Sequence, residues 1–311
     1  MNLASRKLVG AGLTGMTGAA AFVIVVMLGF ILADVVAGGW TRLSLEFITQ
    51  APSEGMTEGG IFPAIYGTAV LTLLMTVAVM PVGVITAIYL HEYAPADSRL
   101  AGLVRVAVQN LAGVPSIVFG LFGLGFFIQF LGRNMDRAFS PEATLRYGQP
   151  ALIWAALTLA VLALPVVIVS TEEALRAVPR DWRDASLALG ATKSQTLVRV
   201  ILPSAVPGIL TGAILAVARG AGEVAPILFT GVAYFLPDLP NGPFSQFMHL
   251  GYHVYVLATQ STDVEATKPL LYATVLVLLS LTFLLNLIAI LLRVRTRRAA
   301  AGHRIELRPG R

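Results

Sequence analysis

The sequence predicts an all-α membrane protein with six transmembrane helices, and three observations support this prediction. The first is composition: 56% of the 311 residues are hydrophobic and only 13% are charged. Soluble domains carry about 25% charged residues, and half that fraction leaves too little polar surface to coat a water-soluble particle of this size. We therefore expect lipid to surround much of the chain, as in a multi-pass protein of the inner membrane.

The second observation is a set of six apolar segments, each close to or above the length of about 20 residues that a helix needs to cross a bilayer. They cover residues 13–36, 65–90, 104–131, 151–170, 206–235 and 270–292. The first segment is longer than the roughly 7–15 apolar residues of a signal peptide. We therefore expect it to stay in the protein as a span.

The third observation is the placement of the 22 Lys and Arg residues. When the six segments alternate in direction, 16 of these residues fall on one side of the membrane and five on the other, while Arg219 lies inside the fifth segment. Cytoplasmic loops carry the excess of Lys and Arg. Both termini are therefore predicted to be cytoplasmic, and residues 293–311 are predicted to form a basic tail there rather than a nucleic-acid-binding arm.

Prolines interrupt several of the segments, namely Pro81, Pro115, Pro165, Pro207 and Pro226. Proline removes a helix hydrogen bond and bends the axis, and lipid cannot satisfy the freed backbone groups. Two interpretations stay open at this point. The prolines are either ordinary kinks of a helix bundle or features that shape helices around a pathway.

The loop after the fifth segment is rich in Pro, Gly and aromatic residues, and residues 247–258 have the spacing of a short interfacial helix. His249 and His253 lie four residues apart in it, but the HExxH pattern of a zinc site is absent, so we expect two polar loop residues. The chain has no cysteine, which excludes thiol catalysis and cysteine metal sites. No pairing of nucleophile and base is evident, so we expect no catalytic residue, no metal and no cofactor.

The loop 171–203, between the fourth and fifth segments, is the most informative polar stretch. Residues 181–189 have helical spacing, with Trp182, Ala185, Ser186 and Leu189 on one face. Gly190 follows as a helix C-cap, and a second helical stretch covers residues 194–201. Two short helices joined by a glycine form either a compact knob in the cytoplasm or an amphipathic hairpin on the membrane.

The spacing in this loop resembles the EAA loop of ABC importer permeases, whose pattern is Glu-Ala-Ala, three residues, Gly, nine residues and Ile-x-Leu-Pro. The matching residues here are Asp184, Ala185, Ser186, Gly190, Val200, Ile201, Leu202 and Pro203. Three of them are conservative departures: Asp for Glu, Ser for Ala and Val for Ile. The resemblance implies a coupling helix that docks on an ATP-binding subunit. This chain has no GxxxxGK[ST] loop, so the ATPase must be a separate protein.

Arg219 and Glu223 place two charges within the fifth segment. A charge at the bilayer centre costs about 2.5–3.5 kcal/mol on insertion scales, and four-residue spacing on a helix lets the two side chains pair. Gly220 and Gly222 leave space beside the arginine for a ligand or a second helix. A guanidinium binds phosphate or carboxylate oxygens in a bidentate way. The pair is therefore either a substrate-pathway site for an anion or a self-neutralised structural link.

The surrounding residues Arg-x-x-Gly-Glu-x-Ala-Pro, from Arg219 to Pro226, resemble the permeases of the high-affinity phosphate (Pst) importer, the A-type subunit (PstA) more than its C-type sister. The similarity extends over about residues 66–231 and includes the stretches 113–124 and 173–179. This chain departs from the usual pattern at Gly220, Ala221 and Val224. The residues 237–268 match poorly.

The resemblance implies a type I importer (MetI-like) fold and an inorganic phosphate importer in which this chain is a non-catalytic subunit. The implied partners are an ATP-binding subunit dimer, a homologous C-type permease and an extracytoplasmic phosphate-binding protein. We divide the chain into a first helix and loop at 1–62, a permease core at 63–292 and the tail at 293–311. The alternatives are a permease for phosphonate, sulfate or molybdate, or a channel or secondary transporter without an ATPase.

Overall fold

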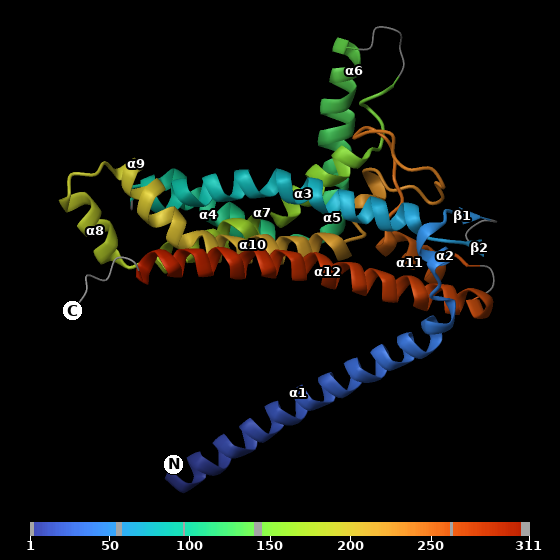
Figure 1. Ribbon diagram of the computed structural model, residues 1–311, viewed down its shortest axis with the longest axis horizontal. Coiled ribbons are helices and arrows are strands. Elements are labelled where there is room, and N and C mark those ends of the chain that lie inside the picture. The colour runs from blue at the N-terminus through green and yellow to red at the C-terminus, as the bar shows by residue number, and fades with distance from the viewer. Residues whose placement is uncertain (1–2, 54–57, 96, 140–144, 262–263, 306–311) are drawn as a thin grey trace.

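The computed structural model describes residues 3–53, 58–95, 97–139, 145–261 and 264–305, which form a helical protein with one short two-stranded ribbon (Figure 1). The elements in chain order are α1 (Leu3–Gly39), η1 (Trp40–Arg42), α2 (Leu45–Thr49), β1 (Pro52–Ser53), β2 (Glu58–Gly59), α3 (Phe62–Ile88), η3 (Tyr89–Tyr93), α4 (Arg99–Ala112), α5 (Ser116–Phe122), η4 (Gly123–Gly132), α6 (Arg133–Phe139), α7 (Leu152–Arg176), α8 (Arg180–Ala188), α9 (Lys193–Thr196), η5 (Leu197–Ile201), α10 (Leu202–Gly222), η6 (Ile227–Phe229), α11 (Leu250–Thr259) and α12 (Val264–Ile305). The strands β1 and β2 pair antiparallel. The predicted all-α class is confirmed.

Within the described residues, six helical stretches are long and apolar enough to cross a membrane, as predicted. They are Gly10–Arg42, Phe62–Tyr93, Ser116–Phe139, Leu152–Arg176, Lys193–Gly222 and Glu265–Thr296. Four of the six agree with the predicted segments to within a turn or two at each end, and the third and fifth differ in the ways described below.

The fourth span, α7, forms the centre of the bundle, between α3 and α10. Small residues bring these helices close together. A side chain at Gly83 on α3 would collide with Val167 on α7, and one at Gly212 on α10 would collide with Ser170. Helices in lipid gain no hydrophobic free energy from association, so close packing of this kind holds them together.

The long helices α3, α10 and α12 run along the same direction, with α8 and α9 at one end and α2, α11 and the strands at the other (Figure 1). We name these the α8 end and the α11 end. Helix α1 starts, and α12 finishes, towards the α8 end (Figure 1). The start of α1 and the end of α12 thus lie on the same side, as an even number of spans requires. The cytoplasmic location of that side stays a prediction.

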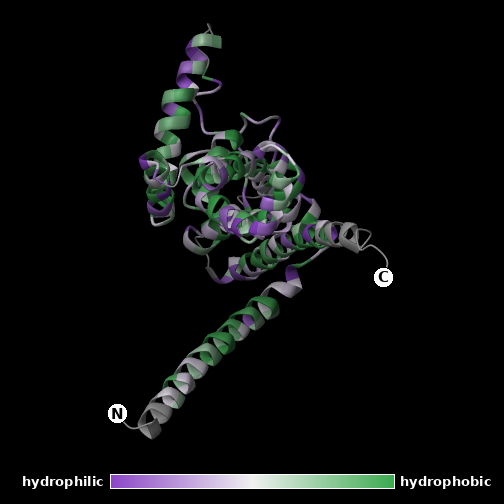
Figure 2. Ribbon diagram, turned by 90° about the vertical axis from the view of Figure 1, so that its left-hand side faces the viewer, coloured by the Kyte–Doolittle hydropathy of each residue, from purple (hydrophilic) through white to green (hydrophobic). Residues whose placement is uncertain are grey.

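Helix α1 runs away from the rest of the protein in both views (Figures 1 and 2) and is largely apolar along its length. Its last turns are packed against α12, where side chains at Gly38 and Gly39 would collide with Tyr272 and with the backbone of Ala273. The Tyr272 hydroxyl also donates a hydrogen bond to Asp34 at 2.8 Å. Glycine here permits the close approach that anchors α1.

The third span was predicted at 104–131, and these bounds are wrong. Residues 99–112 form the separate amphipathic helix α4, and the chain breaks before the span begins at Ser116. Gly113 caps α4, and Pro115 has no N–H to continue the hydrogen-bond ladder. The span then continues through a ten-residue π-helical stretch, η4, into α6. Summed hydropathy misses such a break because both flanking stretches contain many apolar residues.

The fifth span was predicted at 206–235 and instead ends at Gly222. The residue before a proline avoids the helical region, so Ala225-Pro226 prevents the helix from continuing. Apart from the single turn η6, the chain is irregular from Glu223 until α11 begins at Leu250. That later helix confirms the short helix expected within 247–258.

The predicted division at 293 coincides with no break in secondary structure, because α12 continues from Val264 to Ile305. Arg293 and Arg295 therefore lie on the same helix as the last span. The three-part division of the chain stays a prediction.

Candidate functional site

Arg219 lies in the last turn of α10, and Glu223 is the first residue beyond it. The Arg219 Nε donates a hydrogen bond to Glu223 Oε1 at 3.2 Å, as the four-residue spacing predicted. Glu223 has an extended backbone, with φ −79° and ψ 123°. The expectation that both residues lie on one continuous helix is therefore wrong, although they do pair. A cation in the last turn also interacts favourably with the helix dipole.

The pair is open on one side. The Arg219 side chain is 40% exposed and that of Glu223 is 21% exposed. On α10, Leu215, Arg219 and Gly222 are all exposed and follow one another at helical spacing. The exposed face of α10 thus carries a guanidinium with four of its five N–H groups unused by any bond that the described residues make.

The opposite face of α10 is closely packed. A side chain at Gly220 would overlap the sulfur of Met75 on α3, so this glycine makes room for α3. Gly222 has open space around it. Only Gly222 therefore fulfils the expectation that a glycine leaves room beside Arg219 for a ligand or another helix.

The irregular chain after Glu223 is satisfied within the protein. Ala151 N–H donates to the Thr230 carbonyl at 2.9 Å, and Ala233 N–H donates to the Phe247 carbonyl at 2.8 Å. Non-helical backbone at membrane depth is tolerated where protein buries it or where it lines a wet cavity. The break after α10 therefore leaves the Arg219–Glu223 pair at a helix end, with the backbone beyond it hydrogen-bonded within the protein.

The loop 171–203 folds into the expected pair of short helices, α8 and α9. Gly190 has φ +81° and ends α8 in a Schellman motif: its N–H donates to the Leu187 carbonyl, and Ala191 N–H donates to the Ser186 carbonyl. Thr192 and Gln195 cap α9 reciprocally. The predicted C-cap glycine is confirmed.

Side-chain contacts then join the two helices. Ser186 Oγ is 2.9 Å from Thr196 Oγ1, which is buried. Leu202 packs on the apolar cluster that includes Val178, Leu197 and Ile201, and Pro203 occupies the first turn of α10. The positions that match the loop pattern therefore build a compact corner at the start of α10.

The four residues that helical spacing places on one face of α8 differ in their exposure. Trp182 and Ser186 are partly buried, but Ala185 is exposed and Leu189 is 89% exposed. Leu187 and Asp184 are exposed too, so α8 presents leucines and a carboxylate to its surroundings. Arg183 is partly buried, unlike Ala185 and Leu189. Its charge has a partner inside the protein.

That partner is Glu92 in η3, which sequence reasoning missed. Arg183 Nη2 lies 2.8 Å from Glu92 Oε1 and also donates to the Leu175 carbonyl at 2.8 Å. Residues 91 positions apart in the chain share no periodicity, so no local pattern connects them. The only available signal was a carboxylate, Glu92, just after the second apolar segment and an arginine, Arg183, in the predicted helix 181–189.

His249 and His253 are buried, so the expectation of two polar loop residues is wrong in its exposure. Burial lowers the pKa of His249 to about 3 and that of His253 to about 4, because the imidazolium loses its hydration. Both are therefore neutral near pH 7. Among the described residues, no group of three or more His, Asp or Glu side chains could hold a metal ion.

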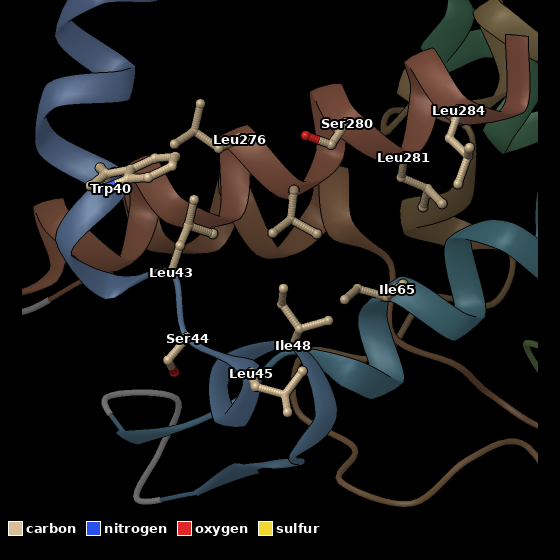
Figure 3. A pocket seen from close by; sticks show the side chains of 11 residues that line it. Trp40, Leu43, Ser44, Leu45, Ile48, Ile65, Leu276, Ser280, Leu281 and Leu284 are labelled. Carbon is tan, nitrogen blue, oxygen red and sulfur yellow. The ribbon is translucent and has the colours of Figure 1, made fainter. Parts of the chain in front are cut away.

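A groove of about 620 Å³ lies elsewhere, between α12 and the turn that joins α1 to α2 (Figure 3). Its walls are apolar side chains with two serines, Ser44 and Ser280, and it contains no charged residue. Trp40 and Leu276 both line it (Figure 3). A groove of this chemistry suits apolar chains rather than an anion, so Arg219 and Glu223 remain the candidate site.

The family comparison covers most of the chain. Residues 79–298 match the family described as binding-protein-dependent transport system inner membrane component. A probable ABC transporter permease protein, YqgI, of Bacillus subtilis is 35% identical over 226 residues, which are 73% of this chain and 71% of that protein.

Two further relatives are named for phosphate transport. A probable phosphate transport system permease protein PstA of Methanocaldococcus jannaschii is 32% identical over 80% of this chain and 81% of its own length. The phosphate transport system permease protein PstA 1 of Mycobacterium tuberculosis is 38% identical, and the match spans 66% of this chain and 64% of that protein.

Solved structures confirm the predicted importer-permease fold. A chain of a bacterial alginate ABC transporter superposes with a TM-score of 0.65 over 93% of this chain and 96% of its own, at 15% sequence identity. A chain of the MetNI methionine ABC transporter superposes with a TM-score of 0.54 over 76% of this chain and 94% of its own, at 20% identity. With six spans, this fold and the match over residues 79–298, the chain belongs to the binding-protein-dependent transport system inner membrane components, as a multi-pass protein of the inner membrane.

Proposed function

We propose that the chain is the A-type permease subunit of an ATP-driven importer for inorganic phosphate. The observation that carries the proposal is the partly open Arg219–Glu223 pair at the end of α10, where the helix stops. The names of the M. jannaschii and M. tuberculosis relatives support the choice of phosphate.

The exposed face of α10 must meet something other than lipid. A charge on a lipid-facing surface near the bilayer centre costs about 2.5–3.5 kcal/mol, and Arg219 cannot lose its proton. Glu223 offsets part of that charge, but four guanidinium N–H groups still need acceptors. A water-containing path shared with a second permease supplies them, and a phosphate ion on that path binds the planar fork in a bidentate way.

Glu223 has two roles in this proposal. Its hydrogen bond at 3.2 Å fixes the guanidinium in one position. Its negative charge also weakens the attraction between Arg219 and a phosphate anion, and transport requires binding that is weak enough for release. An unpaired arginine at this position would hold the anion.

The α8 end faces the cytoplasm in this proposal and contacts a separate ATP-binding subunit. The exposed Leu187 and Leu189 supply an apolar contact, and Asp184 and Ala185 lie on the same accessible helix. The partners are a dimer of that subunit, a C-type permease that faces the exposed side of α10, and an extracytoplasmic phosphate-binding protein. This chain holds the path, and the ATPase subunits perform the hydrolysis.

The experiment is uptake of radiolabelled phosphate by cells that lack their own high-affinity phosphate permease and express this chain with its partner subunits. We expect ATP-dependent uptake that excess unlabelled phosphate abolishes and that sulfate, molybdate and methylphosphonate leave unchanged. Competition by one of those other oxyanions would assign the substrate to it instead. Uptake that continues without the ATP-binding subunit would point to a channel or secondary transporter.

A further inference from the structure

A charged cluster ties the α8 end together. The guanidinium of Arg183 on α8 reaches Glu92 at 2.8 Å and the Leu175 carbonyl at 2.8 Å, and lies 3.5 Å from the His91 ring. Glu92 belongs to η3 directly after α3, and Leu175 belongs to the last turn of α7. One side chain of α8 therefore holds the ends of two membrane-spanning helices.

The ion pair is shielded from solvent. The Glu92 side chain is 8% exposed and that of Arg183 is 21% exposed. Removing one partner of a buried ion pair leaves an uncompensated charge, which is strongly unfavourable. The short helix α8 is therefore held to α3 and α7 by a contact that costs free energy to open.

A second arginine reinforces the same junction. Arg105 of α4 donates to the Leu90 carbonyl at 2.6 Å, and its Nε lies 3.5 Å from Glu172 on α7. Leu90 is two residues before Glu92, so both arginines contact η3. Each binds one carbonyl and one carboxylate, and together they fix the ends of α3 and α7 relative to each other.

Helix α3 connects this junction to the candidate site. It runs unbroken from Phe62 to Ile88 and continues into η3, so Met75 and Glu92 lie on one continuous helical element. Met75 fills the space beside Gly220, the residue next to Arg219 on α10. Pro81 lies inside α3 between Met75 and Glu92, and the helix continues past it. A displacement of η3 therefore has a packed route to the backbone that carries Arg219.

We propose that the Arg183–Glu92 ion pair is the positioning contact that transmits movement of α8 through α3 to the Arg219 segment. The inference rests on the proposed function, because it needs an ATPase that moves α8. It adds the residues that make that movement reach the path. Without the pair, movement of α8 reaches α10 only through α9 and η5, while α3 and its contact beside Arg219 stay behind.

The test is the ratio of phosphate transported to ATP hydrolysed, measured with the complete importer in proteoliposomes. Glu92→Gln keeps the size of the side chain and removes its charge. We expect the ratio to fall at least about fivefold while ATP hydrolysis stays within about twofold of wild type. The charge swap, Arg183→Glu with Glu92→Arg, is expected to restore at least about half of the ratio. Arg176→Gln, which removes an exposed arginine from the last turn of α7, is the matched control and should leave the ratio unchanged.

An unchanged ratio in Glu92→Gln would overturn the inference. This holds whether hydrolysis and transport both stay at wild-type rates or both fall in equal proportion, as expected of a purely structural contact. Where Glu92→Gln does not assemble, the charge swap decides, and its failure to restore the ratio counts against the inference. The proposed function is judged separately on the wild-type importer. If that importer moves no phosphate with ATP, the function is wrong regardless of the variants.

Discussion

Two arginines, Arg183 at the α8 end and Arg219 in the last turn of α10, differ in their exposure and in the partners that this chain gives them. Arg183 is 21% exposed and reaches a carboxylate and a backbone carbonyl. Arg219 is 40% exposed and, among the described residues, makes one side-chain hydrogen bond, to Glu223. The first lies in a polar junction near the end of the bundle, and the second lies on an otherwise apolar helix face.

The difference indicates what each charge is for. A cation that has a carboxylate and a carbonyl of its own chain beside it acts between parts of that chain, and its partners can be named from the fold. A cation left partly open in apolar surroundings is costly, so a partner from outside the chain must offset that cost. The predictions below test this distinction, beginning with the largest expected effect.

Replacing the open cation should abolish the function at little structural cost. We expect Arg219→Ala to lower phosphate uptake roughly 10- to 100-fold, because hydrogen bonds to a charged group are worth about 1.5–3 kcal/mol. The yield of assembled importer should stay normal, since few contacts within the chain depend on this side chain. Uptake in cells and co-purification of the subunits are the two measurements.

Leu215→Ala is the matched control, because it shortens an exposed side chain one turn earlier on the same face. Uptake within about twofold of wild type is expected for it. Equal losses in the two variants would mean that the face matters for packing rather than for charge.

A substitution at Gly190 should make the α8 end less rigid. Its φ of +81° is a left-handed conformation that costs a residue with a side chain about 1–2 kcal/mol. Gly190→Ala should therefore raise amide hydrogen exchange in residues 187–191 roughly five- to thirtyfold. Gly222→Ala, where the structure has open space and no positive φ, should leave exchange at its own site unchanged. Similar protection in both variants would contradict the assignment of Gly190 as an obligatory cap.

Removing the negative partner of Arg219 should make binding tighter and transport slower. In Glu223→Gln the amide oxygen can still accept the Arg219 hydrogen bond, but the charge that opposes an anion is gone. We expect the phosphate concentration for half-maximal uptake and the maximal rate both to fall about three- to fivefold. Initial uptake rates over a range of phosphate concentrations measure both. A higher half-maximal concentration would indicate that Glu223 supports binding instead.

The buried histidines give the smallest effect, on stability against pH. Their pKa values of about 3 and about 4 lie below the ordinary value of 6.5, so the unfolded state binds more protons between these limits. Stability is therefore full above pH 6.5 and falls as the pH is lowered towards 4. Between pH 7.5 and 6.0 the loss should be less than about 1 kcal/mol for each histidine. Melting temperatures of the detergent-solubilised chain measure it, and His253→Gln should lose about half of the pH dependence; an unchanged dependence would assign it to other groups.

Much of this architecture could be predicted from the sequence. Six spans follow from hydropathy, and the cap at Gly190 follows from the local requirement for a residue without a side chain. The pairing of Arg219 with Glu223 follows from their separation of four residues. Each of these features depends on neighbours in the chain, which a sequence displays directly.

Most of the remainder depends on contacts between distant residues. The partners Arg183 and Glu92 are brought together only when α8 folds back onto the end of α3. Helix α10 ends at Gly222 because Pro226 follows, although the apolar stretch continues beyond it. Hydropathy alone predicts a longer helix. The burial of His253 likewise follows from packing around α11. Tertiary packing determines the ion pair and the burial of His253, whereas the break at Gly222 is a local effect of Pro226 that summed hydropathy does not register.

The most direct test of the central claim is whether position 219 meets water in the assembled importer. The chain has no cysteine, so Arg219→Cys introduces a single thiol into it, and a charged, membrane-impermeant methanethiosulfonate reagent reports its exposure. We predict rapid modification in the complete complex, with Leu73→Cys, at an exposed apolar position of α3, as the control that we expect not to react. If position 219 resists the charged reagent and reacts only with a lipid-soluble maleimide, the arginine faces lipid and the account of an anion path is wrong.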